Sequence, residues 1–470
     1  MTEGYLTAGL PAPGGPPSCP LCRTCDEATQ VWLRWFLTEN HSDPTLLRSL
    51  HDSAGFCPAH NRRLLAEAGP QVIRRPLEYA LRGAADRLAS LAGIRDPGRR
   101  RRRRPAGSCP LCRVITERER AVGGDVATAM VRPGTAGVPD DCAGLCFRHL
   151  AGLLPRFSVA QAAVSAEILA SRLTALQAGT PESLLVLAGV DDDALARIPY
   201  LATHARQLRE APVGSRLAGL SPASQLIADL AAGSCPACRA AGREQVRYLL
   251  WLGNSLADGR PAAADVRLCS RHLLDARHLY DDRAAARTGS WLVSVASARS
   301  HAQAVALVAA ARQVLAAPRT GWRRGGGGGG SGSHGNGERP EEAYGAAARA
   351  MAGDRSCRTC RIGLDAERRQ LNLLRACLLD AGVLRAVDDA HGLCLRHASV
   401  IAEDVNARPV LYRLVTQLEQ AQWELDEDAA KRTWDRRHEP KGHEQNVWRR
   451  APALIDGAVY LGVSDRTGHG

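Results

Sequence analysis

The chain has 470 residues, of which 45% are hydrophobic and only 4% aromatic, so its core must rest on aliphatic side chains, a composition that favours helices over sheets. It contains no run of about 18 apolar residues and no basic, apolar leader at its start, so we expect neither a membrane span nor a secretory signal, and we expect a cytoplasmic protein. The net charge of +12 is almost wholly arginine, because only two of the 61 basic residues are lysine, a bias typical of GC-rich bacterial genomes that by itself indicates no acidic partner.

Four copies of one cysteine–histidine pattern follow one another along the chain. Each begins with S-C-x-x-C-R, and C-x-x-H follows after 34, 33, 30 and 33 residues respectively. Three thiolates and one imidazole form a complete tetrahedral ligand set for zinc, and cytosolic thiols stay reduced, so the pattern predicts four zinc ions rather than disulfides. The predicted sets, one within each copy, are Cys19, Cys22, Cys57 and His60; Cys109, Cys112, Cys146 and His149; Cys235, Cys238, Cys269 and His272; and Cys357, Cys360, Cys394 and His397.

The repeated pattern predicts an all-α protein of four zinc-pinned helical modules in tandem. The predicted organisation is a disordered start (1–17), module 1 (18–94), an arginine-rich linker (95–107), module 2 (108–179), a helical insert (180–233), module 3 (234–318), a glycine-rich linker (319–340), module 4 (341–435) and a C-terminal tail (436–470). Ser221-Pro222 is a helix-start pattern inside the insert. Within the tail, short apolar runs around Asp456-Gly457 make 454–461 a candidate β-hairpin.

Each module is predicted to be built from helices that begin at its ligands. Proline follows Cys19, Cys57 and Cys109, which suits a first helical position. After each C-x-x-H we expect a short helix, a break and a long helix, and the long helices are predicted at 76–92, 158–178, 284–317 and 409–427. In module 1, Val31, Trp32, Trp35 and Phe36 fall on one helical face.

Four complete ligand sets favour closed, structural sites over catalytic ones, which keep an open position. A redox C-x-x-C would need a βαβ context that the sequence does not show, and iron–sulfur ligation by the same residues stays open as an alternative. Three cysteines fall outside the sets. Cys25, Cys142 and Cys377 are expected to be buried thiols, with the alternative that Cys25 or Cys142 is an exchangeable fifth ligand.

The segments SCPLCR, GFCPAH and GLCFRH resemble those of an uncharacterised family of bacterial helical proteins that pair C-P-x-C with G-[FL]-C-x-x-H. The resemblance implies metal-bound helical modules and no particular activity. It is incomplete, because Arg267 precedes Leu268-Cys269 where the pattern has glycine, and module 4 lacks proline between Cys357 and Cys360.

No nucleophile-elbow, phosphate-loop or dinucleotide pattern occurs, so the sequence favours a non-enzymatic interaction scaffold with protein partners. A nucleic-acid-binding regulator is a second hypothesis, supported by the six arginines from Arg99 to Arg104, although a solvated linker explains such a run more simply. A metal- or redox-responsive protein or enzyme with a pocket between modules is a third.

Overall fold

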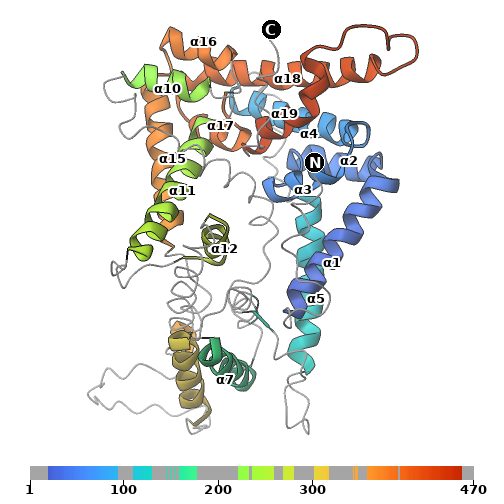
Figure 1. The fold of residues 1–470 in the computed structure, drawn as a ribbon. Helices are drawn as coiled ribbons and strands as arrows, with labels where there is room; N and C mark the ends of the chain where they lie inside the picture. Colours follow the sequence, from blue (N-terminus) through green and yellow to red (C-terminus); the bar gives the residue numbers. More distant parts are fainter. Residues whose placement is uncertain are drawn as a thin grey trace, which may run out of the picture.

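The computed structural model describes residues 19–93, 109–129, 145, 146, 149, 153, 158–176, 221–231, 235–258, 268–279, 301–316, 342, 344–347, 357–389 and 392–457. Every regular element among these residues is a helix, which confirms the all-α class (Figure 1). In this part of the chain no helix is both long enough and apolar enough to cross a membrane. The arginine run, the glycine-rich linker and Cys142 lie outside the described residues, and the module limits remain predictions.

Helices begin directly after the first cysteine of every described half-motif. Repeat 1 forms α1 (Pro20–Trp35), the π-helix η1 (Phe36–Asn40), α2 (Pro44–Ser53), α3 (Pro58–Glu67) and α4 (Pro70–Leu91). Repeat 2 forms α5 (Pro110–Ala129) and α7 (Val159–Leu176), and repeat 3 forms α11 (Pro236–Ala257), α12 (Ser270–Leu279) and a helix at 301–316. Repeat 4 forms α15 (Arg358–Ala376), α16 (Ala381–Asp389), α17 (Leu395–Ile401), the 3-10 helix η4 (Val405–Ala407) and α18 (Arg408–Ala430).

In the described part of the chain, three of the helices with defined bounds lie outside this repeated scheme. Ser221 caps α10 (Pro222–Leu230) by accepting a hydrogen bond from Ser224 N, so the predicted helix start in the insert is confirmed. After repeat 4 come the 3-10 helix η5 (His443–Asn446) and α19 (Val447–Asp456). The hairpin expected at 454–461 is not seen in the described residues, because Leu454 to Asp456 end α19 and Gly457 closes that helix with a left-handed φ of 68°; residues 458–461 lie outside the described part of the chain.

The four repeats are joined in a closed cycle. The helices that follow the C-x-x-C motifs pack in pairs, α1 with α5 and α11 with α15. The long helices pair differently: α4 of repeat 1 packs against α18 of repeat 4, and α7 of repeat 2 shares a core with 301–316 of repeat 3 (Figure 1). Repeat 1 therefore contacts repeats 2 and 4, and repeat 3 contacts the same two.

Two apolar cores support this cycle. The larger surrounds α4 and α18 and includes Phe36, Leu81 and Leu414, and the smaller surrounds α7 and 301–316. The residue before the second cysteine of each C-x-x-C is completely buried in all four repeats, which anchors the first turn of each of these helices; these residues are Leu21, Leu111, Ala237 and Thr359.

The aromatic face predicted on α1 is only partly internal. Trp32 stacks on Phe36 with ring centroids 5.2 Å apart, and both meet Phe56 edge-on. Val31 and Trp35 instead remain 68% and 42% exposed. The side of α1 that they occupy is available to other molecules.

Candidate metal centres

The sixteen predicted ligands come together in four groups, but each group draws on two repeats. The prediction that a C-x-x-C shares an ion with the C-x-x-H of its own repeat is therefore wrong. The observed groups are site A (Cys19, Cys22, Cys146 and His149), site B (Cys57, His60, Cys109 and Cys112), site C (Cys235, Cys238, Cys394 and His397) and site D (Cys269, His272, Cys357 and Cys360).

Helix length explains why a repeat cannot close its own site. In repeat 1, α1 carries the chain about 24 Å away from Cys19, and the ten residues of α2 recover only about 15 Å, at 1.5 Å per residue. Repeat 4 has the same disparity, about 28 Å along α15 against about 14 Å along α16. The C-x-x-H is thus left towards the far end of its own C-x-x-C helix.

The antiparallel neighbour supplies the missing ligands at that far end. Arg113, in the first turn of α5, donates to Ser49 Oγ of α2, while Glu119, further along α5, lies beside His149 of site A. The helices of each pair, α1 with α5 and α11 with α15, lie side by side (Figure 1). Each pair consequently has one ligand group at each end.

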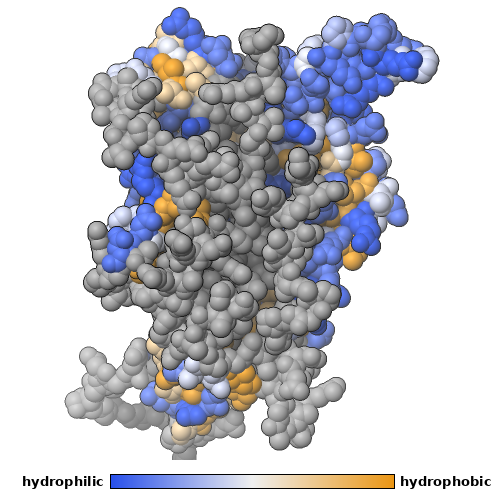
Figure 2. Space-filling model, in the orientation of Figure 1, coloured by the Kyte–Doolittle hydropathy of each residue, from blue (hydrophilic) through white to orange (hydrophobic). Residues whose placement is uncertain are grey.

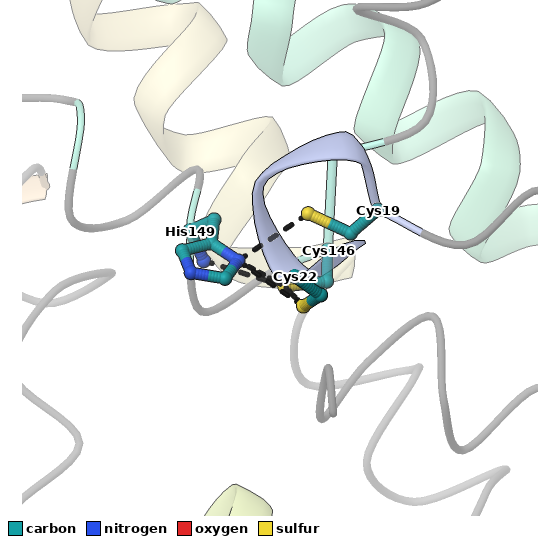
Figure 3. Close-up of side chains that lie close together, drawn as sticks. All are labelled: Cys19, Cys22, Cys146 and His149. Atoms are coloured by element: carbon teal, nitrogen blue, oxygen red, sulfur yellow. Dashed lines mark hydrogen bonds between the residues drawn. The ribbon is translucent and has the colours of Figure 1, made fainter. Parts of the chain in front are cut away.

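The distances within each group fit one tetrahedral ion. The four histidines present Nδ1 to the sulfurs, with Nδ1–Sγ distances of 3.2–3.4 Å throughout; in site A all three are 3.3 Å (Figure 3). Measured Sγ–Sγ distances are 3.8 Å in site A, 3.5 Å in B, 3.9 Å in C and 3.8 Å in D. Bonds of about 2.3 Å to sulfur and 2.0–2.1 Å to nitrogen give tetrahedron edges of about 3.8 Å and about 3.6 Å.

The same groups contain no disulfide among the described residues, and their compactness argues against a polynuclear cluster. A disulfide needs sulfurs about 2.05 Å apart, and none forms among the fourteen described cysteines. A cluster of several irons and sulfides spreads its protein ligands over more than one iron, whereas all four ligand atoms of each group lie within 4.8 Å of one another, which favours a single ion.

Among the described residues, carboxylates lie near Nε2 of three of the histidines, and two of these carboxylates are glutamates. Glu119 Oε1 lies 3.7 Å from His149 Nε2, and Glu367 Oε1 lies 3.1 Å from His397 Nε2. Each glutamate is ten residues beyond the first cysteine of its own C-x-x-C, and it serves the histidine of the opposite site on the helix pair. A carboxylate within hydrogen-bond distance of Nε2, as Glu367 is at 3.1 Å, fixes the ring orientation and makes the coordinating nitrogen more basic. The position of each glutamate is visible in the sequence, but only the pairing of repeats in the structure shows which histidine it lies beside.

With no ion bound, the electrostatics favour a mixture of charged and neutral ligands: hydrogen bonds with Cys109 and Cys57 raise the pKa of Cys112, which stays a neutral thiol. Hydrogen bonds from Cys112 and Cys57 lower the pKa of Cys109 to about 3. Burial alone would lower the pKa of His149, but contacts with Cys146 and Cys19 outweigh it and raise that pKa to about 12 when no ion is bound. A metal ion can replace this imidazole proton, because zinc ligation requires neutral histidine and thiolate.

Two glycines explain the G-[FL]-C pattern. Gly55 and Gly392, each two residues before a ligand cysteine, have φ of 99° and 66°, a backbone conformation that residues with a side chain rarely adopt. A third, Gly457, lies against site C: a Cβ atom there would come 2.5 Å from Cys238 Sγ and 2.6 Å from Cys394 Sγ. The end of α19 thus closes over this site by main chain alone.

The described cysteines outside the ligand sets have different surroundings. Cys377 is buried in the larger core, as expected of a structural thiol. Cys25 is half-buried and groups with Glu119 and His149 rather than with the three site A sulfurs. A fifth-ligand role for Cys25 therefore stays a prediction.

No protein-family model, curated protein or solved structure matches this chain. The clusters agree with the metal-binding motifs, and the family resemblance and bacterial origin remain predictions.

Proposed function

We propose that this protein is a zinc-binding helical scaffold whose four ions are structural, and that it acts by binding other proteins rather than by catalysis. The observation that carries the proposal is the set of four tetrahedral groups of three cysteines and one histidine. Zinc suits these donors and these distances, and four protein ligands leave no open position for a substrate.

The placement of the sites explains what the ions contribute. Each ion links two neighbouring repeats through ligands that are far apart in sequence, for instance Cys19 and His149. Together the ions fasten both ends of the α1–α5 and α11–α15 pairs, and the long helices complete the cycle. Such a frame is rigid where the ions are and leaves its outer faces free.

Exposed aromatic side chains support a binding role for those outer faces. Trp251, Trp423 and Trp434 are 57%, 58% and 75% exposed, and Trp35 occupies in repeat 1 the position that Trp251 has in repeat 3. Hydrophobic side chains also reach the surface beside α1 and α7 (Figure 2). Tryptophan is enriched among the residues that dominate protein interfaces.

The first test is the metal content of protein purified without added metal. We expect about four zinc ions per chain by elemental analysis and native mass spectrometry, and a large fall in melting temperature when a strong chelator removes them. Iron in place of zinc, or metal-free protein with the same melting temperature, would overturn the structural-zinc assignment.

The scaffold role needs its own test. Trp251→Ala and Trp423→Ala chains should retain their metal and melting temperature, but recover less of any protein that co-purifies with the unmodified chain from its own cells. Leu364→Ala, which alters an exposed aliphatic residue on α15, is the matched control. Equal recovery with all variants would contradict binding through these tryptophans.

Nucleic-acid binding is the second candidate, and it rests on the +12 charge and the run Arg99 to Arg104. Binding through phosphates must weaken steeply with salt. Retention of DNA or RNA at low salt that disappears when the six arginines become serines would favour it over the protein scaffold.

A further inference from the structure

We propose that sites B and D are exchangeable metal sites, which release their ions to competing ligands, whereas sites A and C hold their ions permanently. This inference rests on the proposed function, because it assumes that all four groups bind zinc. It divides the four sites into two pairs that correspond in sequence order, A with C and B with D.

Exposure separates the two pairs. In site A all four ligands are buried, with exposures from 1% to 6%, and in site C Cys235, Cys394 and His397 are 0% exposed. Sites B and D each have two half-buried thiols, namely Cys57 and Cys112 in site B, and Cys269 and Cys360 in site D.

The half-buried sulfurs form one edge of each tetrahedron. Cys57 Sγ and Cys112 Sγ are 3.5 Å apart in site B, and Cys269 Sγ and Cys360 Sγ are 3.8 Å apart in site D. A competing ligand with two donor atoms can approach the ion along such an edge. The ion then exchanges one thiolate at a time for an incoming donor and never has to leave as a free cation.

The corresponding edges of the other two sites are closed. In site A that edge joins Cys22 and Cys146, which are both buried. In site C it joins Cys238 and Cys394, and Gly457 lies directly against both sulfurs. The half-buried Cys238 is therefore covered from the side on which a competing ligand would have to approach.

Among the described residues, carboxylates approach the histidines of sites A and C more closely than those of sites B and D. Glu119 and Glu367 back the histidines of sites A and C. The matching positions, ten residues beyond Cys19 and Cys235, are the neutral residues Thr29 and Gln245. In site D, Asp275 lies 3.9 Å from His272 Nε2, a longer separation than that of either glutamate. Carboxylate support of this kind is worth about 10–100-fold in metal affinity.

A chelator that changes colour when it binds zinc tests the proposal on the intact, zinc-loaded chain. With excess 4-(2-pyridylazo)resorcinol we expect two equal phases of about two ions each, with rates that differ by about tenfold or more. The double variant Glu119→Gln and Glu367→Gln should accelerate the slow phase and leave the fast one unchanged. Glu117→Gln, an exposed position on α5, is the matched control and should change neither phase.

Alkylation identifies which sites release first. N-ethylmaleimide added during the fast phase, followed by peptide mass mapping, should label Cys57, Cys112, Cys269 and Cys360 before any other ligand cysteine. Four bound ions that leave in a single phase, or early labelling of Cys19 and Cys235, would overturn this inference and leave the structural-zinc proposal intact. A chain that binds no zinc would overturn both.

Discussion

Replacing cysteines in pairs distinguishes metal sites shared between repeats from sites within repeats. Cys57 and Cys109 belong to the same site, although 51 residues separate them in sequence, whereas Cys19 belongs to a different one. The double variant Cys57→Ala and Cys109→Ala should therefore lose one ion, and the double variant Cys19→Ala and Cys57→Ala should lose two. Ions held within each repeat would give the opposite result.

The unfolding free energies should follow the same division. A structural zinc contributes about 10–16 kcal/mol of binding free energy in isolated zinc-finger peptides, so its loss dominates the effect of the first substitution in a site. Once the ion of site B has gone, losing a second ligand of that site should cost little more. Sites A and B lie at opposite ends of the α1–α5 pair, so losses at both should add to within about 0.5 kcal/mol.

Native mass spectrometry of protein purified without added metal or chelator counts the ions, and thermal melts followed by circular dichroism report the stability. Cys377→Ala is the control, because this buried cysteine belongs to none of the sites, and it should keep all four ions. A Cys19→Ala, Cys57→Ala chain that retains about three ions would refute the sharing of sites between repeats.

Three further predictions follow from the packing and charges. Gly457→Ala should lower the free energy of unfolding by about 1–3 kcal/mol more than Gly93→Ala in chemical denaturation, and it should weaken metal binding at site C. Both glycines have φ of 68°, but only Gly457 faces the site C sulfurs. Equal losses of unfolding free energy would contradict the close approach. Leu111→Ala should lower the unfolding free energy by about 2–5 kcal/mol, because Leu111 is 0% exposed. Leu364→Ala, at a residue that is 52% exposed, should change it by less than about 0.5 kcal/mol. Similar effects of the two substitutions would argue against the burial of Leu111. In metal-free protein at about pH 8, the imidazole of His149 should stay protonated, because this pH lies above the ordinary pKa of 6.5 and below the raised pKa of about 12. ¹⁵N NMR should show the charged ring, and its conversion to the neutral form when zinc is added. A neutral ring before zinc is added would contradict the prediction.

The identity of the ligands could be predicted from the sequence, but which of them share an ion could not. Spacing shows that Cys19 and Cys22 act together, because one helical turn brings both to the same ion. The distance from Cys22 to Cys57 does not show whether the intervening chain returns to its start. The lengths of α1 and α2, and the antiparallel packing of α5, determine that the chain does not return to Cys22 before it reaches Cys57.

Other features depended on contacts that no local pattern contains. The helix start at Ser221 was predictable, since proline and a capping hydroxyl act locally. Asp456-Gly457 resembled a hairpin turn, but packing of Val447 and Ala451 in the larger core holds the preceding residues as a helix. Glu367 was unremarkable in sequence because its partner, His397, is thirty residues away.

Sharing ligands between repeats places the metal sites one inside another along the chain. Site B spans residues 57–112 and lies entirely within the span of site A, 19–149; likewise site D, 269–360, lies within site C, 235–397. During synthesis at about 5–20 residues per second, the inner site of each pair is complete first, while Cys19 and Cys22 wait for ligands more than a hundred residues behind them. Translation therefore completes the inner sites, B and D, before the outer and more buried sites, A and C.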